Sequence, residues 1–214
     1  MRIGTLTRKA YHCGLNQIDS VNNLMSFGWN LLALPSNYMR HTRDVMSGES
    51  AVDYNSRLQT LLKFHSIRLL LRLPSRRLDA LNWLALWQEN LEICYRIFEI
   101  IQQWDMQATL TVDPAVCFIA LSILILLHLH SQSNGISNPT LVSQLSRRKT
   151  VIRLFLQRYA NHWVLPRFLL VSFDTFVLKV SEPLQPEDIC HIMDHFHGPL
   201  HQKWLNFLSP FQFD

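Results

Sequence analysis

One uninterrupted apolar stretch, DPAVCFIALSILILLHLH, runs from Asp113 to His130. Asp113 is a favourable N-cap residue, and Pro114 suits the first position of a helix. After Asp113 the stretch contains no residue of fixed charge, and Ser122 carries its only hydroxyl. A helix that is apolar on all sides has to be enclosed on all sides. The stretch therefore predicts a helix over 114–130 that is surrounded either by other helices or by lipid.

The length of this stretch favours enclosure by protein. A helix that crosses a bilayer needs about 20 apolar residues, with a lower limit near 17. The run from Pro114 to His130 is shorter than 20 residues, ends in His128 and His130, and has no aromatic or basic anchor just outside it. We therefore expect an all-α, multi-helix bundle built around the buried helix. The alternative is a small helical integral membrane protein with 114–130 and 164–180 as its spans.

The overall composition agrees with a folded helical chain. Hydrophobic residues make up 48% of the 214 positions, and glycine, with 6 residues, is too scarce for an all-β fold. The net charge of +4 would permit contact with nucleic acid but does not predict it, because the sequence contains no dense basic run. The strongest basic cluster, Arg147, Arg148 and Lys149, is expected to be a solvated edge.

Cysteine usage indicates a reducing compartment. The four cysteines are widely separated and form neither a disulfide framework nor a CxxC pair. Cys94 and Cys117 lie in apolar helical patterns, so we expect them to be small core residues. The basic N-terminus, MRIGTLTRKAYHCG, lacks the apolar segment of a secretory signal, and its lack of acids leaves a mitochondrial presequence as an alternative.

Periodicity predicts the organisation of the rest of the chain. We expect a disordered N-terminus over 1–15 and a single helical domain over 16–214. Besides the central helix, the pattern predicts helices over about 16–34, 53–73, 77–104, 141–163, 168–180 and 187–196. The segments 36–52, 131–139 and 181–186 are expected to be loops or turns, with Gly135 and Pro139 in the clearest break.

Three of these helices have clear inward faces. The inward residues of helix 53–73 are Tyr54, Leu58, Leu61, Leu62, His65 and Leu69, with Arg57 and Arg68 off that face. Helix 77–104 has a main stripe of Leu84, Trp87, Leu91, Cys94, Phe98 and Ile101 and an outer face that includes Glu89, Glu92 and Arg96. Helix 141–163 should turn inward Leu145, Ile152, Phe155, Leu156 and Tyr159.

Few residues suggest chemistry. The only cluster of metal-ligand types is Cys190, His191, His195, His197 and His201. His191 and His195 have zinc-site spacing, but HIMDH lacks the glutamate of HExxH, so we expect a solvated helix end. His65 is expected to be a hydrogen-bonded core residue, and Asp174 a partnered or surface-facing one. Neither a phosphate loop nor a GxSxG elbow is present. We therefore expect no enzyme, no catalytic residue, no metal ligand and no cofactor. The alternative is a metal-dependent enzyme that uses the histidine cluster.

Several residues and short runs follow one another in a recognisable order along the chain. They are Trp29, Leu34 and Pro35; the run YNSRLQTLLKFHSIRLLLRLP with Tyr54, His65, Arg68, Leu70, Leu71 and Pro74; Trp87, Cys94, Ile97 and Ile100; the Pro114–His130 helix; and Tyr159 with Trp163. Over about 16–180 this order resembles the middle homology, or regulatory, domain of fungal binuclear zinc cluster transcription factors. The chain departs from that pattern at Leu71-Arg72-Leu73-Pro74, where the family has His-Arg-Pro, and at Val164, where it often has alanine.

The resemblance implies a regulatory and interaction module that modulates transcription by RNA polymerase II in the nucleus. It implies protein partners or self-association, a small-molecule effector and no membrane contact. The family's six-cysteine zinc cluster is not in these 214 residues. Zinc ligands and DNA contacts are therefore not carried over, and DNA would be reached only through such a module. The chain thus resembles the C-terminal part of such a factor, a truncated gene product or a paralogue without the DNA reader.

Overall fold

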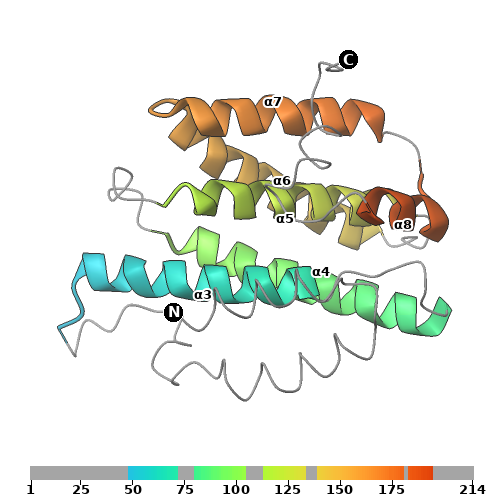
Figure 1. The fold of residues 1–214 in the computed structure, drawn as a ribbon, viewed down its shortest axis with the longest axis horizontal. Helices are drawn as coiled ribbons and strands as arrows, with labels where there is room; N and C mark the ends of the chain where they lie inside the picture. Colours follow the sequence, from blue (N-terminus) through green and yellow to red (C-terminus); the bar gives the residue numbers. More distant parts are fainter. Residues whose placement is uncertain (1–47, 72–79, 105–112, 134–138, 181–182, 195–214) are drawn as a thin grey trace.

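The computed structural model describes residues 48–71, 80–104, 113–133, 139–180 and 183–194. Across these ranges the chain forms six helices that pack side by side, and no strand (Figure 1). The helices are α3 (Ala51–Leu71), α4 (Ala80–Gln102), α5 (Ala115–Gln132), α6 (Pro139–Ala160), α7 (Val164–Lys179) and α8 (Pro186–Asp194). The predicted all-α bundle is confirmed. The expected helix at 16–34 and the disordered segment at 1–15 lie outside the described residues.

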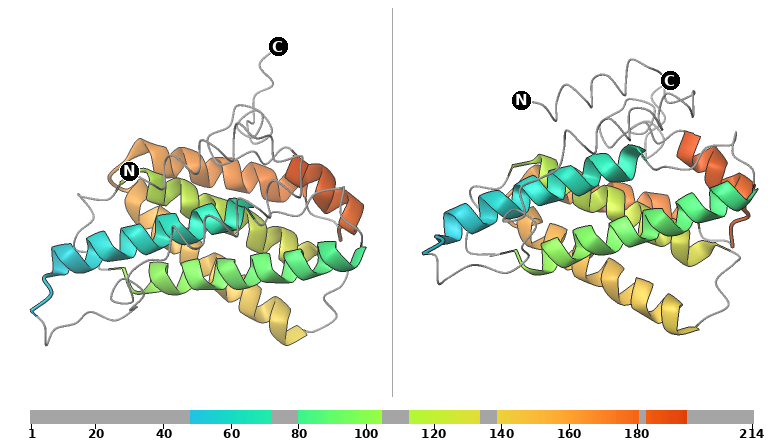
Figure 2. Two further views of the ribbon diagram at one scale, coloured as in Figure 1. Left: turned by 60° about the horizontal axis from the view of Figure 1, so that its bottom comes forward. Right: turned by 90° about the horizontal axis from the view of Figure 1, so that it is seen from below.

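Helix α5 is the centre of the bundle, as the sequence predicts. It contacts α3, α4, α6 and α7, and every residue from Ile119 to His130 is buried (Figures 1 and 2). In the described part of the chain, Ala115–Gln132 is the one helix that is long and apolar enough to cross a membrane by length and composition. Inside the fold, 78% of that helix is buried. Neighbouring helices therefore supply the enclosure that its composition demands.

The start of α5 is fixed by Asp113. One carboxylate oxygen accepts a hydrogen bond from the N–H of Ala115 at 2.9 Å, which satisfies a backbone donor of the first turn. The other oxygen pairs with the ammonium group of Lys63 on α3. The hydrogen bond from Lys63, helped by the one from Ala115, lowers the pKa of the Asp113 carboxyl. The predicted cap thus also ties the central helix to α3.

The inward faces predicted for α3 and α6 are confirmed, since all of their residues are buried. The predicted helix over 168–180 forms most of α7. Pro166 lies in the first turn of α7, so it marks a break after α6, and Pro139 begins α6. The predicted last helix corresponds to α8 as far as the description extends.

Two details of the predicted faces are wrong. Leu84 is 49% exposed, because Trp83 takes the inward position and donates its indole N–H to the sulfur of Cys190 on α8 at 2.8 Å. Arg57 is buried, because Glu49 pairs with its guanidinium at 2.8 and 3.0 Å. Cys190 is more than 100 residues from Trp83, and Glu49 lies outside α3. The periodicity of a single helix contains no information about such partners.

The basic cluster is also only partly a solvated edge. Arg147 is exposed, but Arg148 lies over the ring of Tyr95 on α4, 3.6 Å from its centroid. Lys149 is half-buried and donates to the hydroxyl of Ser131 at 2.9 Å. Two of the three basic side chains are therefore held against neighbouring helices.

Two histidines lie inside the core on α5. His128 hydrogen-bonds through Nε2 to the carbonyl oxygen of Val180 at 2.8 Å. His130 is 2% exposed and stacks on Trp87, with ring centroids 3.7 Å apart. Its Nε2 has no hydrogen-bond partner among the described residues, and burial lowers the pKa of His130 to about 3. The ring therefore stays neutral in the folded chain at ordinary pH.

Replacing His130 by phenylalanine should flatten the acid dependence of stability. The unfolded chain takes up a proton on this ring below about pH 6.5, whereas the folded chain does so only near pH 3. The free energy of unfolding therefore falls as the pH drops between these values, and H130F removes that contribution while keeping a ring on Trp87. Urea titrations at pH 7 and pH 4.5 should show a smaller midpoint change for H130F than for the parent.

The control variant is H162Q, which replaces an exposed histidine outside the core. His128 has a pKa lowered mainly by burial and accounts for part of the acid sensitivity that remains in H130F. An H130F midpoint that changes with pH as much as that of the parent contradicts the assignment.

Candidate ligand-binding groove

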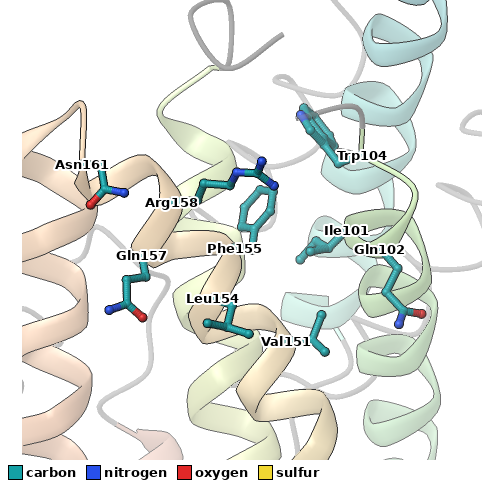
Figure 3. A pocket seen from close by; sticks show the side chains of 9 residues that line it. All are labelled: Ile101, Gln102, Trp104, Val151, Leu154, Phe155, Gln157, Arg158 and Asn161. Atoms are coloured by element: carbon teal, nitrogen blue, oxygen red, sulfur yellow. The ribbon is translucent and has the colours of Figure 1, made fainter. Parts of the chain in front are cut away.

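A groove of about 730 Å³ opens between the end of α4 and the second half of α6 (Figure 3). Its lining combines five apolar or aromatic side chains with four polar ones. They are Ile101, Gln102, Trp104, Val151, Leu154, Phe155, Gln157, Arg158 and Asn161. The volume lies within the range of small-molecule sites in proteins.

The floor of the groove is one face of α6. Leu154, Phe155 and Arg158 lie three, four and seven residues after Val151, so all four project from the same side. Phe155 is buried, whereas Leu154 is 57% exposed at the groove. Ile101, in the last turn of α4, is buried and faces this side of α6 (Figure 3). The result is an apolar floor that is partly open to solvent.

Aromatic rings form the closed end. Trp104 is 4% exposed and meets Phe155 edge to face at a centroid separation of 6.3 Å. Phe155 in turn packs against Tyr159 at 4.9 Å. Burial raises the pKa of Tyr159 to about 12, an effect that the neighbouring indole of Trp104 partly opposes. This wall is held from both helices, so its shape is set before any ligand arrives.

The rim carries one cation and three amides. The guanidinium of Arg158 extends towards Trp104, while Gln157 and Asn161 project on the other side of α6 (Figure 3). Arg158 is exposed, and no carboxylate from the described helices forms an ion pair with it. A guanidinium that the described carboxylates leave unpaired, beside an apolar floor, suits a ligand with an apolar body and an anionic end.

The residues singled out from sequence lie elsewhere. Cys190 is buried and accepts the Trp83 hydrogen bond, while His191 is exposed. The remaining histidines of that cluster, His195, His197 and His201, lie outside the described residues. Within the ranges that the structure describes, no group of three or more His, Cys, Asp or Glu side chains could hold a metal ion.

Asp174 is partnered as predicted, and His65 lies in the core as predicted. Both carboxylate oxygens of Asp174 accept from the guanidinium of Arg153 on α6, at 2.5 and 3.0 Å, so the prediction of a partnered aspartate is confirmed. His65 is buried with its ring edge-on to Phe64. Asp174 therefore ties α6 to α7, and neither side chain belongs to the groove lining.

The groove itself was not predicted. Its one sequence signal is Leu154, an apolar residue on the side of α6 that continues into Arg158. That signal is weak, because single exposed leucines are common on protein surfaces.

No protein-family model, curated protein or solved structure matches this chain. The geometry of the described helices and the order of the residues along the chain are therefore the basis for any function. Among the described helices, the groove between α4 and α6 is a candidate place for a ligand.

Removing the charge of Arg158 should weaken binding of an amphipathic anion. The probe is 8-anilinonaphthalene-1-sulfonate, which has an apolar body and one sulfonate and fluoresces when shielded from water. A charge-assisted hydrogen bond is worth about 1.5–3 kcal/mol, so R158A should raise the dissociation constant by roughly 10- to 100-fold. Fluorescence titration of the parent and R158A measures the change.

The matched control is R147A, which removes the same charge from an exposed position of α6 away from the groove. It should bind the probe as the parent does. Equal losses in R147A and R158A, or no loss in R158A, would count against the groove as the site of anion recognition.

Proposed function

We propose that this chain is a regulatory and interaction module of a transcriptional regulator, not an enzyme. In this proposal the helical body restrains or permits transcriptional activation in the nucleus, and the groove between α4 and α6 receives an effector. The observation that carries the proposal is the position of the family-like residues, that is, the residues on which the resemblance to the fungal regulatory domain rests. Several of those that the structure describes occupy contacts between helices or the core of the bundle.

Several of the described family-like residues lie in such contacts or in the core. The hydroxyl of Tyr54 on α3 donates to the side-chain oxygen of Gln103, just after α4, at 3.4 Å. Trp87 on α4 stacks on His130 of α5. Cys94, Ile97 and Ile100 of α4 are fully buried, and Tyr159 at the end of α6 contacts Trp163 at 6.0 Å.

This arrangement gives the resemblance a physical meaning. A residue pattern that defines helix–helix contacts specifies how the helices are arranged, so chains that share the pattern are expected to share the arrangement. The pattern contains no group that performs chemistry. It therefore supports a shared body whose task is to bind and respond, which is the role of the regulatory domain in the family that the sequence resembles.

The groove supports the effector part of the proposal. Ile101 and Phe155 line the groove and also belong to the hydrophobic core that includes α5. A ligand seated between α4 and α6 touches both helices at once. Its binding energy then favours those arrangements of the two helices that fit it, which is the requirement for an effector.

Contact with DNA and binding of zinc are assigned to a separate module. The family's zinc ions are held by closely spaced cysteines, and the four cysteines of this chain are widely separated. Of these, Cys94, Cys117 and Cys190 are buried in the helical body. The proposed partners of this chain are accordingly proteins, including a second copy, and a small molecule.

A reporter assay tests the regulatory role. The whole chain, fused behind a heterologous DNA-binding module in a fungal reporter strain, should change reporter expression severalfold relative to that module alone. R158A should reduce this change because it impairs the groove, whereas R147A should not. Reporter levels identical to those of the module alone, at equal protein level and in all growth media tested, would contradict the proposal.

One observation favours the membrane alternative, namely the length and hydropathy of α5. Four helices cover that helix, so insertion into lipid would require the bundle to open. We therefore expect the expressed chain to leave the membrane pellet when cells are extracted with alkaline carbonate. Retention of the folded chain in the pellet would support the membrane protein instead.

A further inference from the structure

Helix α7 is apolar on two opposite sides. Its inner side is buried against α5 and α6 through residues that include Leu169, Phe173 and Phe176. Its outer side carries four large apolar side chains that face solvent, Val164, Phe168, Val171 and Leu178, which are 79%, 50%, 51% and 80% exposed. Half of the exposed large hydrophobic residues of the described chain thus lie on this one helix face.

The exposed side chains form a regular seam. Together with the half-buried Thr175, they follow one another at steps of 4, 3, 4 and 3 residues, which is the spacing at which two helices pack along each other. From Val164 to Leu178 the seam extends for roughly 21 Å along the helix. Figure 1 shows α7 at the edge of the bundle, where α5 and α6 lie on one side of it only.

We propose that this seam, Val164, Phe168, Val171, Thr175 and Leu178, is the interface of a homodimer in which the α7 helices of two copies pack antiparallel. This proposal does not depend on the transcriptional role. It assigns the proposed self-association of the chain to a specific surface. It also provides the enclosure that the composition of α7 requires.

The side chains of the seam complement themselves in size. A two-fold axis at Val171 places Val164 of one copy against Leu178 of the other. It also places Phe168 of one copy against Thr175 of the other, so that a large side chain meets a small one on each side of the axis. A parallel pair would instead set the two Phe168 rings against each other and leave the two Thr175 side chains together.

The charges beside the seam are complementary in the same arrangement. Arg167 and Asp174 are seven residues apart, so they flank the seam on the same side. Antiparallel packing brings Arg167 of each copy alongside Asp174 of the other, and the two-fold axis repeats the pair. Contacts with α6 already hold both side chains near this flank, Arg167 on the carbonyl of Ala160 at 3.2 Å and Asp174 on Arg153.

The size of the seam sets the expected affinity. A single pair of helices of this length is at the low end of specific interfaces, which bury about 1,200–2,000 Å² in total. We therefore expect a dimer with a dissociation constant in roughly the micromolar range. Sedimentation of the whole chain over a wide concentration range should show a reversible change from monomer to dimer.

A charge at the centre of the seam should break the dimer. V171E places a carboxylate at the two-fold axis, where both copies would bury it without a partner, so the dissociation constant should rise at least about 100-fold. The helical circular dichroism should not change, because Val171 faces solvent in the single copy. V171L should keep the dimer, which separates loss of packing from loss of folding.

The matched control is V52E, a valine on α3 that is 72% exposed and lies outside the seam. It should dimerise as the parent does. A parent chain that stays monomeric at all concentrations, or a dimer that V171E leaves intact, overturns the proposal. Flotation with phosphatidylcholine–phosphatidylserine vesicles tests for a lipid partner. If the parent chain floats with the vesicles as a monomer and V171E does not, the seam binds lipid and the dimer proposal is overturned.

Disulfide trapping reports the orientation of the two helices. In the antiparallel pair V164C should cross-link to L178C when the two variants are mixed and oxidised, and neither should cross-link to itself beyond the level of the parent. Efficient cross-linking of each variant alone shows a parallel pair and overturns the antiparallel interface.

Discussion

The fold depends on the need to enclose a helix that has no polar side. Helix α5 contacts four other helices, and each of these turns its own apolar stripe towards it. The polar groups that α5 brings into the core are accommodated individually, by a carbonyl for His128 and by an aromatic ring for His130. The order of the helices around α5 in turn places α6 between the groove on one side and α7 on the other.

Much of this could be predicted from the sequence. The inner faces of α3 and α6 follow strict helical spacing, so residues such as Leu58 and Ile152 were assigned correctly from position alone. The errors lie where a tertiary partner decides. Leu84 is displaced by Trp83 because α8 offers Cys190, and Arg57 is buried because Glu49 neutralises it. Neither Cys190 nor Glu49 belongs to the helix whose residue pattern gives the prediction.

The two candidate surfaces were beyond sequence analysis for different reasons. The groove is a space between α4 and α6, so it depends on how far apart two helices lie and not on either helix alone. On α7 the spacing of Val164, Phe168 and Val171 is visible in the sequence, but the opposite face is equally apolar. Only the position of α7 at the edge of the bundle decides which face is buried and which is left open.

The hairpin of α6 and α7, fastened by Arg153 and Asp174, has one consequence for how signals could be combined. One arm of this hairpin lines the groove, and the other carries the seam. If occupancy of one surface shifts the hairpin relative to the core, thermodynamic reciprocity requires each event to change the affinity of the other by the same factor. Ligand binding at the groove and dimerisation at the seam would then influence each other through the α6–α7 hairpin.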